Sequence, residues 1–328
     1  MINAAITGTG FYCPPKVVTN FDLEKIVETS NDWIVERTGI QQRHITDENT
    51  FTSDLATEAA KKAIENAGLT PLDIDLILVA TVTGDMMTPS TACLVQGRIG
   101  AANAAAMDVN AACAGFIHAV NTAKQYINNG VYKNVLIIGV ECLSKVTDWK
   151  DRATCVLFGD GAGAVVLSAT EKDCGVKGCV MGADGTMGHV LTICNLKHEQ
   201  MEIDRRVSGI PQTLWMDGSE VFKFAVRVMV SATDKVLEQA GMTIEDIDLI
   251  IPHQANIRII DGAIKRMKVS RDKVVCNIQN YGNMSSASIP VALCEAVEQG
   301  RVKPGANILM VGFGAGLTWA ATIIKWME

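Results

Sequence analysis

This sequence of 328 residues lacks both long apolar runs and a signal-like start. It contains no uninterrupted apolar stretch of about 18 residues, which is close to the length that a membrane-spanning helix requires. The N-terminal segment MINAAITGTG has no basic residues ahead of an apolar core, so it does not resemble a secretory signal. We therefore expect a cytoplasmic protein with no membrane partner.

Histidine is scarce, and the cysteines are not spaced as a metal site requires. The five histidines are not set at ligand spacing along a helix, and no C-x-x-C pair occurs, the closest two cysteines being Cys174 and Cys179. The ten cysteines are scattered through apolar segments of a long chain, which favours reduced, buried side chains over a disulfide framework. We expect no bound metal.

An excess of positive charge is also absent. The net charge of −7 argues against nucleic acid as a partner, because phosphate-binding surfaces usually bring a basic balance. The rest of the composition, 48% hydrophobic and 20% charged, is that of an ordinary soluble globular protein. A chain of this length predicts two domains or one large duplicated unit.

An internal repeat is the most informative feature that is present. The segment Lys62–Val79 aligns without gaps on Lys235–Pro252, with ten of eighteen positions identical. The same offset of 173 residues lays Asn110 on Asn283 and the run VLIIGV on ILMVGF, so the register holds for about 75 residues. Self-similarity at this level predicts two copies of one structural unit.

Each copy alternates the patterns of helices and strands. A helix is expected from Ser53 as its N-cap to Gly68 just past its end, followed by the buried strand IDLILVAT. Such alternation predicts mixed α/β sheets covered by helices, and the last two strands of each copy form an antiparallel hairpin. We assign residues 1–170 to the first half, 171–218 to an insertion or crossover near the site, and 219–328 to the second half.

Cys113, in the stretch DVNAACAGF, is the candidate nucleophile. It stands between a strand-like and a helix-like segment among small neighbours, where a substrate could reach its sulfur. A helix N-terminus favours thiolate and is expected to lower the pKa of the cysteine, and its N–H groups can hold an oxyanion. A buried structural cysteine is the alternative.

The repeat also indicates where partners of Cys113 lie. Ala80, at the end of a strand in the first half, corresponds to His253, and Asn110 corresponds to Asn283. If the halves pack with pseudo-twofold symmetry, His253 and Asn283 face Cys113 across one cleft. Taken singly, a core histidine and a turn asparagine are equally ordinary interpretations.

Two glycine loops and several cations complete the set of candidates. The loops GDGAG and GFGAG each lead into a strand, so they lack the context of a phosphate loop, and we interpret them as tight turns. Trp33, Arg37 and Arg152 could clamp an adenine and phosphates. Arg258, Lys265 and Arg266 share one face of a helix and could dock an acidic partner, although solvated surface cations would give the same pattern.

The motifs DVNAACAGF, PHQANIRI, YGNMSSASIP and GFGAGLTW, in that order, with NDWIVERTGI near the start, resemble the β-ketoacyl-acyl carrier protein synthase III family of bacterial fatty-acid synthesis. The resemblance runs from the first strand to the last. It implies a thiolase-like α/β fold in which duplicated βαβαβαββ halves, with two five-stranded sheets, form an α-β-α-β-α layering. It also implies a homodimer.

Carried over position by position, the resemblance assigns roles to residues of this chain. The catalytic triad falls on Cys113, His253 and Asn283, and the oxyanion donors are the backbone N–H groups of Cys113 and Ala315. The implied coenzyme A contacts are Trp33, Arg37, Arg152, Phe222 and Asn256. The implied docking patch for acyl carrier protein is Lys223, Arg258, Lys265 and Arg266.

The reaction implied by the resemblance joins an acyl-CoA primer to malonyl-acyl carrier protein through an acyl-Cys113 intermediate. Decarboxylation gives 3-oxoacyl-acyl carrier protein, with acyl-CoA as a substrate and no cofactor. GFGAG has no second cysteine, position 283 is not histidine and ATVTGD has no glutamate, which disfavours three other chemistries of the superfamily. A related acyltransferase of secondary metabolism and a non-catalytic acyl-binding paralogue remain as alternatives.

One position departs from the family pattern. Acetyl-selective members usually carry phenylalanine just before the Pro-Ser that follows the first-half strand, where it closes the acyl pocket of the partner subunit. Here DMMTPS puts Thr88 at that place. We expect a roomier pocket that accepts branched or longer primers.

Overall fold

The computed structural model describes residues 2–194 and 213–327, and two central sheets organise them. The first sheet has the strand order β1-β7-β6-β4-β5. Its strands are β1 (Asn3–Tyr12), β4 (Leu76–Ala80), β5 (Ala105–Val109), β6 (Asn134–Cys142) and β7 (Asp160–Thr170). The second has the order β11-β12-β13-β8, from β8 (Gly175–Ala183), β11 (Leu249–Pro252), β12 (Asn307–Gly314) and β13 (Thr318–Lys325).

Shorter strands and the helices connect and cover the sheets. Two small hairpins pair β2 (Val17–Thr19) with β3 (Gln42–His44) and β9 (Leu191–Ile193) with β10 (Leu214–Met216). The α-helices are α1 (Asn20–Leu23), α2 (Asn31–Thr38), α3 (Thr52–Asn66), α4 (Thr91–Ile99), α5 (Gly115–Asn128), α6 (Arg152–Cys155), α7 (Gly218–Ala240), α8 (Ile257–Met267), α9 (Ile278–Tyr281) and α10 (Ser288–Glu298). The short 3-10 helices are η1 (Pro71–Asp73), η2 (Ala112–Ala114), η3 (Leu143–Lys145), η4 (Gly185–Val190), η5 (Ile244–Asp246), η6 (Arg271–Lys273) and η7 (Ser285–Ala287).

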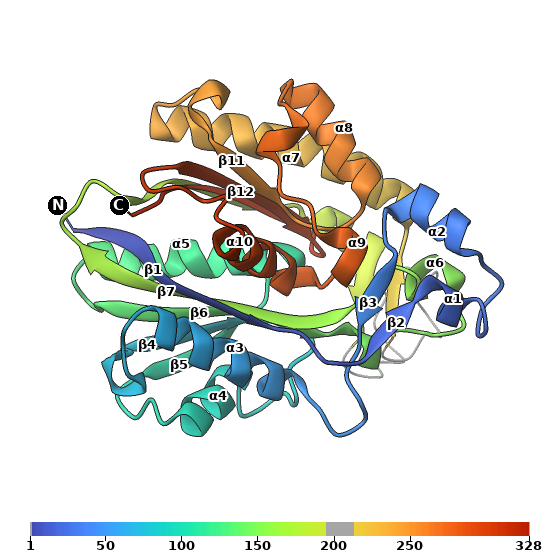
Figure 1. Ribbon diagram of the computed structural model, residues 1–328, viewed down its shortest axis with the longest axis horizontal. Helices are drawn as coiled ribbons and strands as arrows, with labels where there is room; N and C mark the ends of the chain where they lie inside the picture. Colours follow the sequence, from blue (N-terminus) through green and yellow to red (C-terminus); the bar gives the residue numbers. More distant parts are fainter. Residues whose placement is uncertain (1, 195–212, 328) are drawn as a thin grey trace.

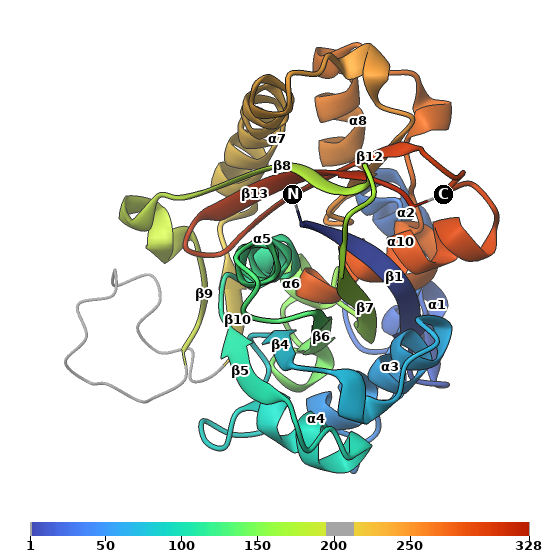
Figure 2. The same cartoon turned by 90° about the vertical axis from the view of Figure 1, so that its left-hand side faces the viewer.

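Five layers result, and they confirm the predicted α-β-α-β-α order. Figures 1 and 2 show α7 and α8 above the second sheet, α5 and α10 between the sheets, and α3 and α4 beneath the first sheet. The middle layer is fully enclosed, because α5 and α10 present buried side chains to both sheets. The predicted terminal hairpins are also present, as β6 pairs with β7 and β12 with β13, both antiparallel.

Close backbone contacts hold the outer helix α3 against the first sheet. A Cβ on Gly8 would lie 2.2 Å from the Ala63 carbonyl oxygen, so only glycine lets β1 and α3 approach this closely. The strand β4 is buried along its whole length, as expected for a parallel strand covered on both faces. Large apolar surfaces therefore fix the first half as a rigid base for the site.

The helix α3 begins slightly earlier than predicted. Its N-cap is Phe51 rather than Ser53, while Gly68 follows its end with a left-handed φ of 67° as expected. The backbone N–H of Ser53 donates instead to the Asp85 carboxylate at 2.9 Å. A side chain from a neighbouring loop thus stabilises the helix start that the sequence pattern assigned to Ser53.

The segment predicted as an insertion, 171–218, contributes to the second sheet. Its strand β8 pairs with β13 over Gly175–Ala183, in the place that β1 holds beside β7 in the first half. The second half therefore begins before residue 219. Part of the predicted insertion, residues 195–212, lies outside the described residues.

The second sheet has four strands where five were predicted. Its outer position is reduced to a single parallel bridge between Ile250 and Val274. In the first half β5 fills this position and pairs with five consecutive residues of β4. The ungapped offset of 173 residues places the equivalent of β5 at residues 278–282, where the structure has α9, so the register breaks here and returns by Asn283.

Within the described ranges, no helix is long and apolar enough to cross a membrane. Over the same residues, no group of three or more His, Cys, Asp or Glu side chains is placed to hold a metal ion.

Candidate active site

The turn that carries Cys113 joins β5 to the central helix α5. Cys113 lies in η2, directly before α5, and Ala112 has a left-handed φ of 46°. The second half repeats the turn at η7, directly before α10, where Ser285 also has a φ of 46°. The two strained turns contact each other, so the repeat brings the helix starts together as predicted.

A cavity of about 1720 Å³ opens over these turns, and Cys113, His253, Asn283 and Ala315 all line it. The Cys113 side chain is half-buried, surrounded by protein but open on the cavity side. The structure thus brings together the triad that the repeat and the resemblance predicted. The cavity is large enough for an extended acyl thioester.

His253 follows β11 and lies deep in the cavity wall. Its side chain is 1% exposed, and its ring packs edge-on against Phe313 with the centroids 5.4 Å apart. The Nδ1 atom has no hydrogen-bond partner among the described residues, and burial lowers the pKa of the imidazole to about 3. The ring is therefore neutral at ordinary pH and can present one N–H to a ligand.

Asn283 is fixed by its own backbone and by the turn that follows it. Its N–H donates to the Leu157 carbonyl at 2.9 Å, and its carbonyl accepts from Gly159 at 3.0 Å. Its Oδ1 accepts from the Ser285 N–H at 2.8 Å. Because Oδ1 is engaged in this way, the amide NH2 is the end that can donate into the cavity.

The second glycine loop packs directly on the nucleophile turn. A Cβ on Gly314 would lie 2.5 Å from the Cys113 backbone nitrogen, so glycine is required for this approach. Thr318 ties the two segments together, since its hydroxyl donates to the carbonyls of Ala111 at 2.9 Å and Ala315 at 3.1 Å. The Ala315 backbone is consequently held against the turn that carries Cys113.

The predicted nucleotide contacts gather at the cavity mouth. The Arg152 guanidinium lies 5.1 Å from the Trp33 ring centroid and that of Arg37 lies 5.7 Å from it. Asn256 joins this group, because its side-chain NH2 donates to the Arg37 carbonyl at 3.0 Å. Phe222 on α7, 38% exposed, also lines the cavity, whereas Arg152 lies just outside its lining.

Comparisons with known proteins agree with this geometry. Two family models match, 3-oxoacyl-[acyl-carrier-protein] synthase III over residues 107–185 and its C-terminal part over residues 237–326. A β-ketoacyl-[acyl-carrier-protein] synthase III from Caldanaerobacter subterraneus subsp. tengcongensis is 55% identical over 327 residues, which is 100% of this chain and 99% of that protein. The chain belongs to the β-ketoacyl-acyl carrier protein synthase III family.

Solved structures lead to the same assignment. The 3-oxoacyl-[acyl-carrier-protein] synthase III of Aquifex aeolicus is 47% identical with a TM-score of 0.92, covering 98% of this chain and 100% of that one. The priming β-ketosynthase of the R1128 polyketide pathway is 36% identical with the same TM-score of 0.92, covering 99% and 97%. The prediction of a thiolase-like acyltransferase is confirmed.

The expectation of a low pKa for the Cys113 thiol is wrong for the free protein. Burial raises the pKa of Cys113 to about 12, the nearby Glu141 charge adds to the rise, and hydrogen bonding from Ser285 opposes it. Desolvation of the charged form outweighs the helix N-terminus. The sulfur of the free protein therefore carries a proton, which must leave before it can attack.

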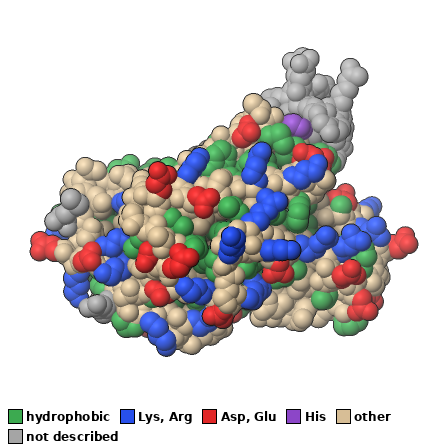
Figure 3. All heavy atoms as spheres, turned by 90° about the horizontal axis from the view of Figure 1, so that it is seen from above, with side chains coloured by type: hydrophobic (Ala, Val, Ile, Leu, Met, Phe, Trp, Pro, Cys, Tyr) green, Lys and Arg blue, Asp and Glu red, His purple; other side chains and the backbone are tan. Residues whose placement is uncertain are grey.

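The predicted docking cations of this synthase III lie on one exposed face. Figure 3 views the molecule from the side of α7 and α8 and shows basic side chains across it. Lys223 and Arg258 line the cavity rim, while Lys265 and Arg266 lie farther along α8. Lys223 is paired with Glu220 at 2.8 Å, so its charge is shared within α7.

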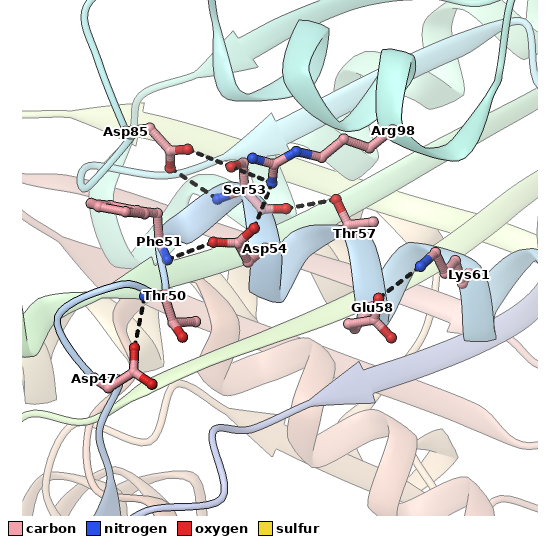
Figure 4. A network of polar contacts seen from close by, with 10 residues as sticks. All are labelled: Asp47, Thr50, Phe51, Ser53, Asp54, Thr57, Glu58, Lys61, Asp85 and Arg98. Atoms are coloured by element: carbon pink, nitrogen blue, oxygen red, sulfur yellow. Dashed lines mark hydrogen bonds and ion pairs between the residues drawn. The ribbon is translucent and has the colours of Figure 1, made fainter.

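Thr88 lies in the exposed loop between β4 and α4 and does not line the cavity of its own chain. A polar network anchors this loop (Figure 4): Asp85 accepts from Ser53, and Arg98 on α4 donates to the Ser53 hydroxyl at 2.6 Å. Arg98 also pairs with Asp54 at 2.9 Å. The loop tip is therefore held at its base and projects from the molecule.

Sequence reasoning missed two buried polar residues at the site. Glu141, near the end of β6, is 0% exposed and lies behind the nucleophile turn, and Ser285 lines the cavity beside Cys113. A lone acidic residue closing the apolar run VLIIGVEC is the signal that could have revealed Glu141. Hydroxyl residues such as Ser285 are common in turns and give no comparable signal.

Proposed function

We propose that this protein condenses an acyl-CoA primer with malonyl-acyl carrier protein, releasing carbon dioxide and forming 3-oxoacyl-acyl carrier protein. The observation that carries the proposal is the convergence of Cys113, a neutral His253 and Asn283 on one large cavity. The relatives named above supply the acceptor, which their names give as acyl carrier protein.

The first half-reaction is acyl transfer to Cys113. The sulfur attacks the thioester carbonyl, and the backbone N–H groups of Cys113 and Ala315 hold the oxyanion. Support comes from the tight packing of Gly314 on the Cys113 nitrogen, which brings the loop of Ala315 next to the Cys113 backbone. Coenzyme A then leaves as the thiol, and the acyl group remains on the enzyme.

The second half-reaction is decarboxylation and carbon–carbon bond formation. The imidazole of His253 and the amide NH2 of Asn283 act as neutral donors to the malonyl thioester oxygen and stabilise the enolate that forms when carbon dioxide leaves. The enolate carbon attacks the acyl-Cys113 carbonyl and releases the sulfur. A neutral imidazole suits this role, since it donates a hydrogen bond without protonating the enolate.

The cavity mouth fits a nucleotide-bearing substrate and an acidic carrier. Trp33 with Arg37 and Arg152 offers a flat ring and two guanidinium groups for the adenine and phosphates of coenzyme A, with Phe222 and Asn256 along the path. Lys223, Arg258, Lys265 and Arg266 supply the positive face for acyl carrier protein.

We further propose that the protein works as a homodimer joined along β5, in the cytoplasm. Within the described residues the strand β5 pairs only with β4, which leaves its outer edge open there, and Met107 on it is 37% exposed. Met86 and Met87, 50% and 70% exposed, extend the apolar surface into the loop that carries Thr88. In such a dimer Thr88 would reach the acyl pocket of the partner.

Intact-mass measurement tests the proposal. The protein is mixed with acetyl-, isobutyryl- and hexanoyl-CoA, and we expect a mass increase equal to one acyl group that disappears in Cys113→Ala. An adduct that persists in this variant, or no adduct with any primer, would overturn the acyl-Cys113 mechanism. Added malonyl-acyl carrier protein is expected to discharge the adduct as 3-oxoacyl-acyl carrier protein.

A second function is favoured by one comparison. The priming ketosynthase of the R1128 polyketide pathway matches this chain as well in fold as the Aquifex protein does. Supplying carrier proteins of fatty-acid and of polyketide type in parallel separates the two acceptors. The intact set of Cys113, His253 and Asn283 disfavours a non-catalytic acyl-binding role.

A further inference from the structure

Glu141 is a buried carboxylate for which the proposed mechanism has no use. It is 0% exposed near the end of β6, in the base of the first half. Its oxygens accept from the Val82 N–H at 3.1 Å and from hydroxyls of Thr83 at 2.6 Å and Thr81 at 3.2 Å. Burying an acid costs free energy, so its place beneath the reactive centre calls for an explanation.

The same carboxylate reaches across to the second half. The hydroxyls of Ser285 and Ser286 in η7 both donate to its Oε1, each at 3.1 Å. Ser285 also lines the cavity with Cys113, its turn η7 contacts the Cys113 turn η2, and its hydroxyl lowers the pKa of the thiol, whereas Ser286 turns back to the Ala80 carbonyl at 2.7 Å. The Ser285 hydroxyl therefore bonds the buried acid from the turn that packs against the reactive cysteine.

We propose that Glu141 holds the thiol proton of Cys113 while the sulfur carries the acyl group, with the Ser285 hydroxyl as the bridge. The inference rests on the proposed function, because it concerns the acyl-Cys113 intermediate. Glu141 acts through Ser285 and does not touch the substrate, so it is a positioning residue for the proton.

Acylation begins with transfer of the thiol proton from Cys113 to Glu141. The Cys113 S–H proton passes to Ser285 Oγ while the Ser285 proton passes to Glu141, leaving a thiolate and a neutral carboxylic acid. The thiolate forms the new C–S bond, the C–S bond to coenzyme A breaks, and coenzyme A leaves as a thiolate that takes a proton from solvent.

The condensation step returns the stored proton. Malonyl decarboxylation gives an enolate that attacks the acyl-Cys113 carbonyl, and the sulfur is released as a thiolate. Glu141 gives its proton back through Ser285, which restores the thiol and the carboxylate. During this half-reaction the acid is neutral, so it places no negative charge behind the enolate.

The surroundings of Glu141 suit an acceptor of moderate strength. Burial raises the pKa of Glu141 to about 7, although the hydrogen bonds that its carboxylate accepts act to lower this pKa. The titratable groups facing it are the thiols of Cys113 and Cys142, and Asp160 pairs with Cys142 on the adjacent strand β7. No cation within the described residues forms an ion pair with it.

His253 is the weaker candidate for this role. The pKa of its buried imidazole is lowered to about 3, so it takes up a proton far less readily than Glu141 does. Among the acids that the structure describes, Glu141 is the one that the hydroxyl of Ser285 bonds. Glu141 thus accepts the thiol proton, while His253 and Asn283 donate hydrogen bonds to the enolate.

The test compares Glu141→Gln with the wild-type protein in two single-turnover reactions. Glutamine mimics the protonated acid, so acylation by acyl-CoA at pH 7.5 is expected to slow about a hundredfold. Discharge of pre-acylated enzyme by malonyl-acyl carrier protein is expected to stay within about twofold. In wild type the acylation rate falls as pH drops through about 7, because Glu141 becomes protonated.

In the Glu141→Gln variant the levelling of the rate above about pH 7 is lost, and the rate keeps rising on the order of tenfold per pH unit with thiol ionisation alone. If Glu141 only repelled the thiolate, its removal would speed both acylation and iodoacetamide alkylation of Cys113, and that result overturns the proposal. Failure of the wild-type protein to form any adduct counts against the proposed function instead.

Two serine variants, which form a matched pair, test the proposal if Glu141→Gln does not fold. Ser285→Ala and Ser286→Ala each remove one hydrogen bond to Glu141, but only the first breaks the bridge to the sulfur. We expect slow acylation with no break in the pH profile near pH 7 in Ser285→Ala, and near wild-type behaviour in Ser286→Ala. A break near pH 7 that is retained in Ser285→Ala overturns the proposal. Asp160→Asn controls for loss of a buried carboxylate elsewhere.

Discussion

Ala112 and Ser285, 173 residues apart, adopt the same left-handed backbone with a φ of 46°. Each stands at the start of a 3-10 turn that leads into a central helix, and the two turns meet under the cavity. One turn presents the Cys113 sulfur and the other presents a hydroxyl to it. Ser285 corresponds to Ala112 and not to Cys113, so the pseudo-symmetry brings the two turns together while the nucleophile and the hydroxyl come from adjacent positions of the repeat.

The packing of the glycine loop on the nucleophile turn predicts a severe effect for Gly314→Ala. The added Cβ would lie 2.5 Å from the Cys113 nitrogen, so the loop or the turn must shift. Because catalysis depends on placement of the oxyanion donors, we expect acylation to fall about a hundredfold or more. Gly97→Ala, where a Cβ meets nothing within 4 Å, is the control for a glycine substitution, and equal activity in the two variants would contradict the argument.

His253 predicts a split between the two half-reactions. His253→Ala removes an enolate donor that acyl transfer does not use, so acylation should stay within a few-fold while condensation falls about a hundredfold. Rapid-quench mass spectrometry of the adduct and its discharge by malonyl-acyl carrier protein measures both rates. Equal losses in the two steps would show that His253 acts earlier than we infer.

The buried imidazole also predicts a pH dependence of stability. The unfolded chain takes up a proton on His253 below about pH 6.5, whereas burial lowers the pKa in the folded protein to about 3. Its contribution to the free energy of unfolding therefore falls as pH drops through this window. The difference between wild type and His253→Asn in urea unfolding at pH 7 and pH 5 isolates the effect, and we expect wild type to lose more stability on acidification.

The ring and guanidinium cluster at the cavity mouth predicts a binding effect. Trp33→Ala removes the surface on which Arg37 and Arg152 are arranged, so we expect KM for acyl-CoA to rise about tenfold, in line with the worth of a cation–π contact. The kcat value should change little, because the cluster lies away from the sulfur. A fall in kcat with KM unchanged would place Trp33 in the chemical step instead.

The loop that carries Thr88 predicts primer selectivity. If Thr88 reaches the acyl pocket of a partner subunit, Thr88→Phe should narrow that pocket and shift preference toward acetyl-CoA. A series of primers from acetyl to octanoyl measures kcat/KM for both proteins, and we expect long and branched primers to lose the most. Strict acetyl preference in the wild-type protein would refute the roomier pocket.

Much of the architecture could be predicted from the sequence because the repeat is strong in its helices and strands. The offset located His253 and Asn283 opposite Cys113 because it also matches Ala112 with Ser285, the turns that face each other. The same fixed offset failed at the outer strand of the second sheet, where Val274 makes only a bridge. It also missed β8, since sequence similarity to β1 is weak while the pairing with β13 is unambiguous.

The electrostatics of the site were harder to foresee. A helix N-terminus suggested a low pKa for Cys113, but burial and the charge of Glu141 raise it. Burial depends on what the second half places over the turn, and a local pattern around Cys113 does not contain that information. Glu141 was overlooked for the same reason, because its partners Ser285 and Ser286 come from the other half of the chain.

The contact between η2 and η7 has a consequence for how this chain can change. Each half has its own sheet and its own outer hydrophobic core, a third core is shared between them, and the sulfur and the groups that serve it are likewise divided between the halves. A substitution that displaced either turn would therefore be felt by both copies at once. The duplicated halves are free to diverge over most of their surface. At the contact between η2 and η7, however, a substitution in one turn is accepted only if the other turn still fits it.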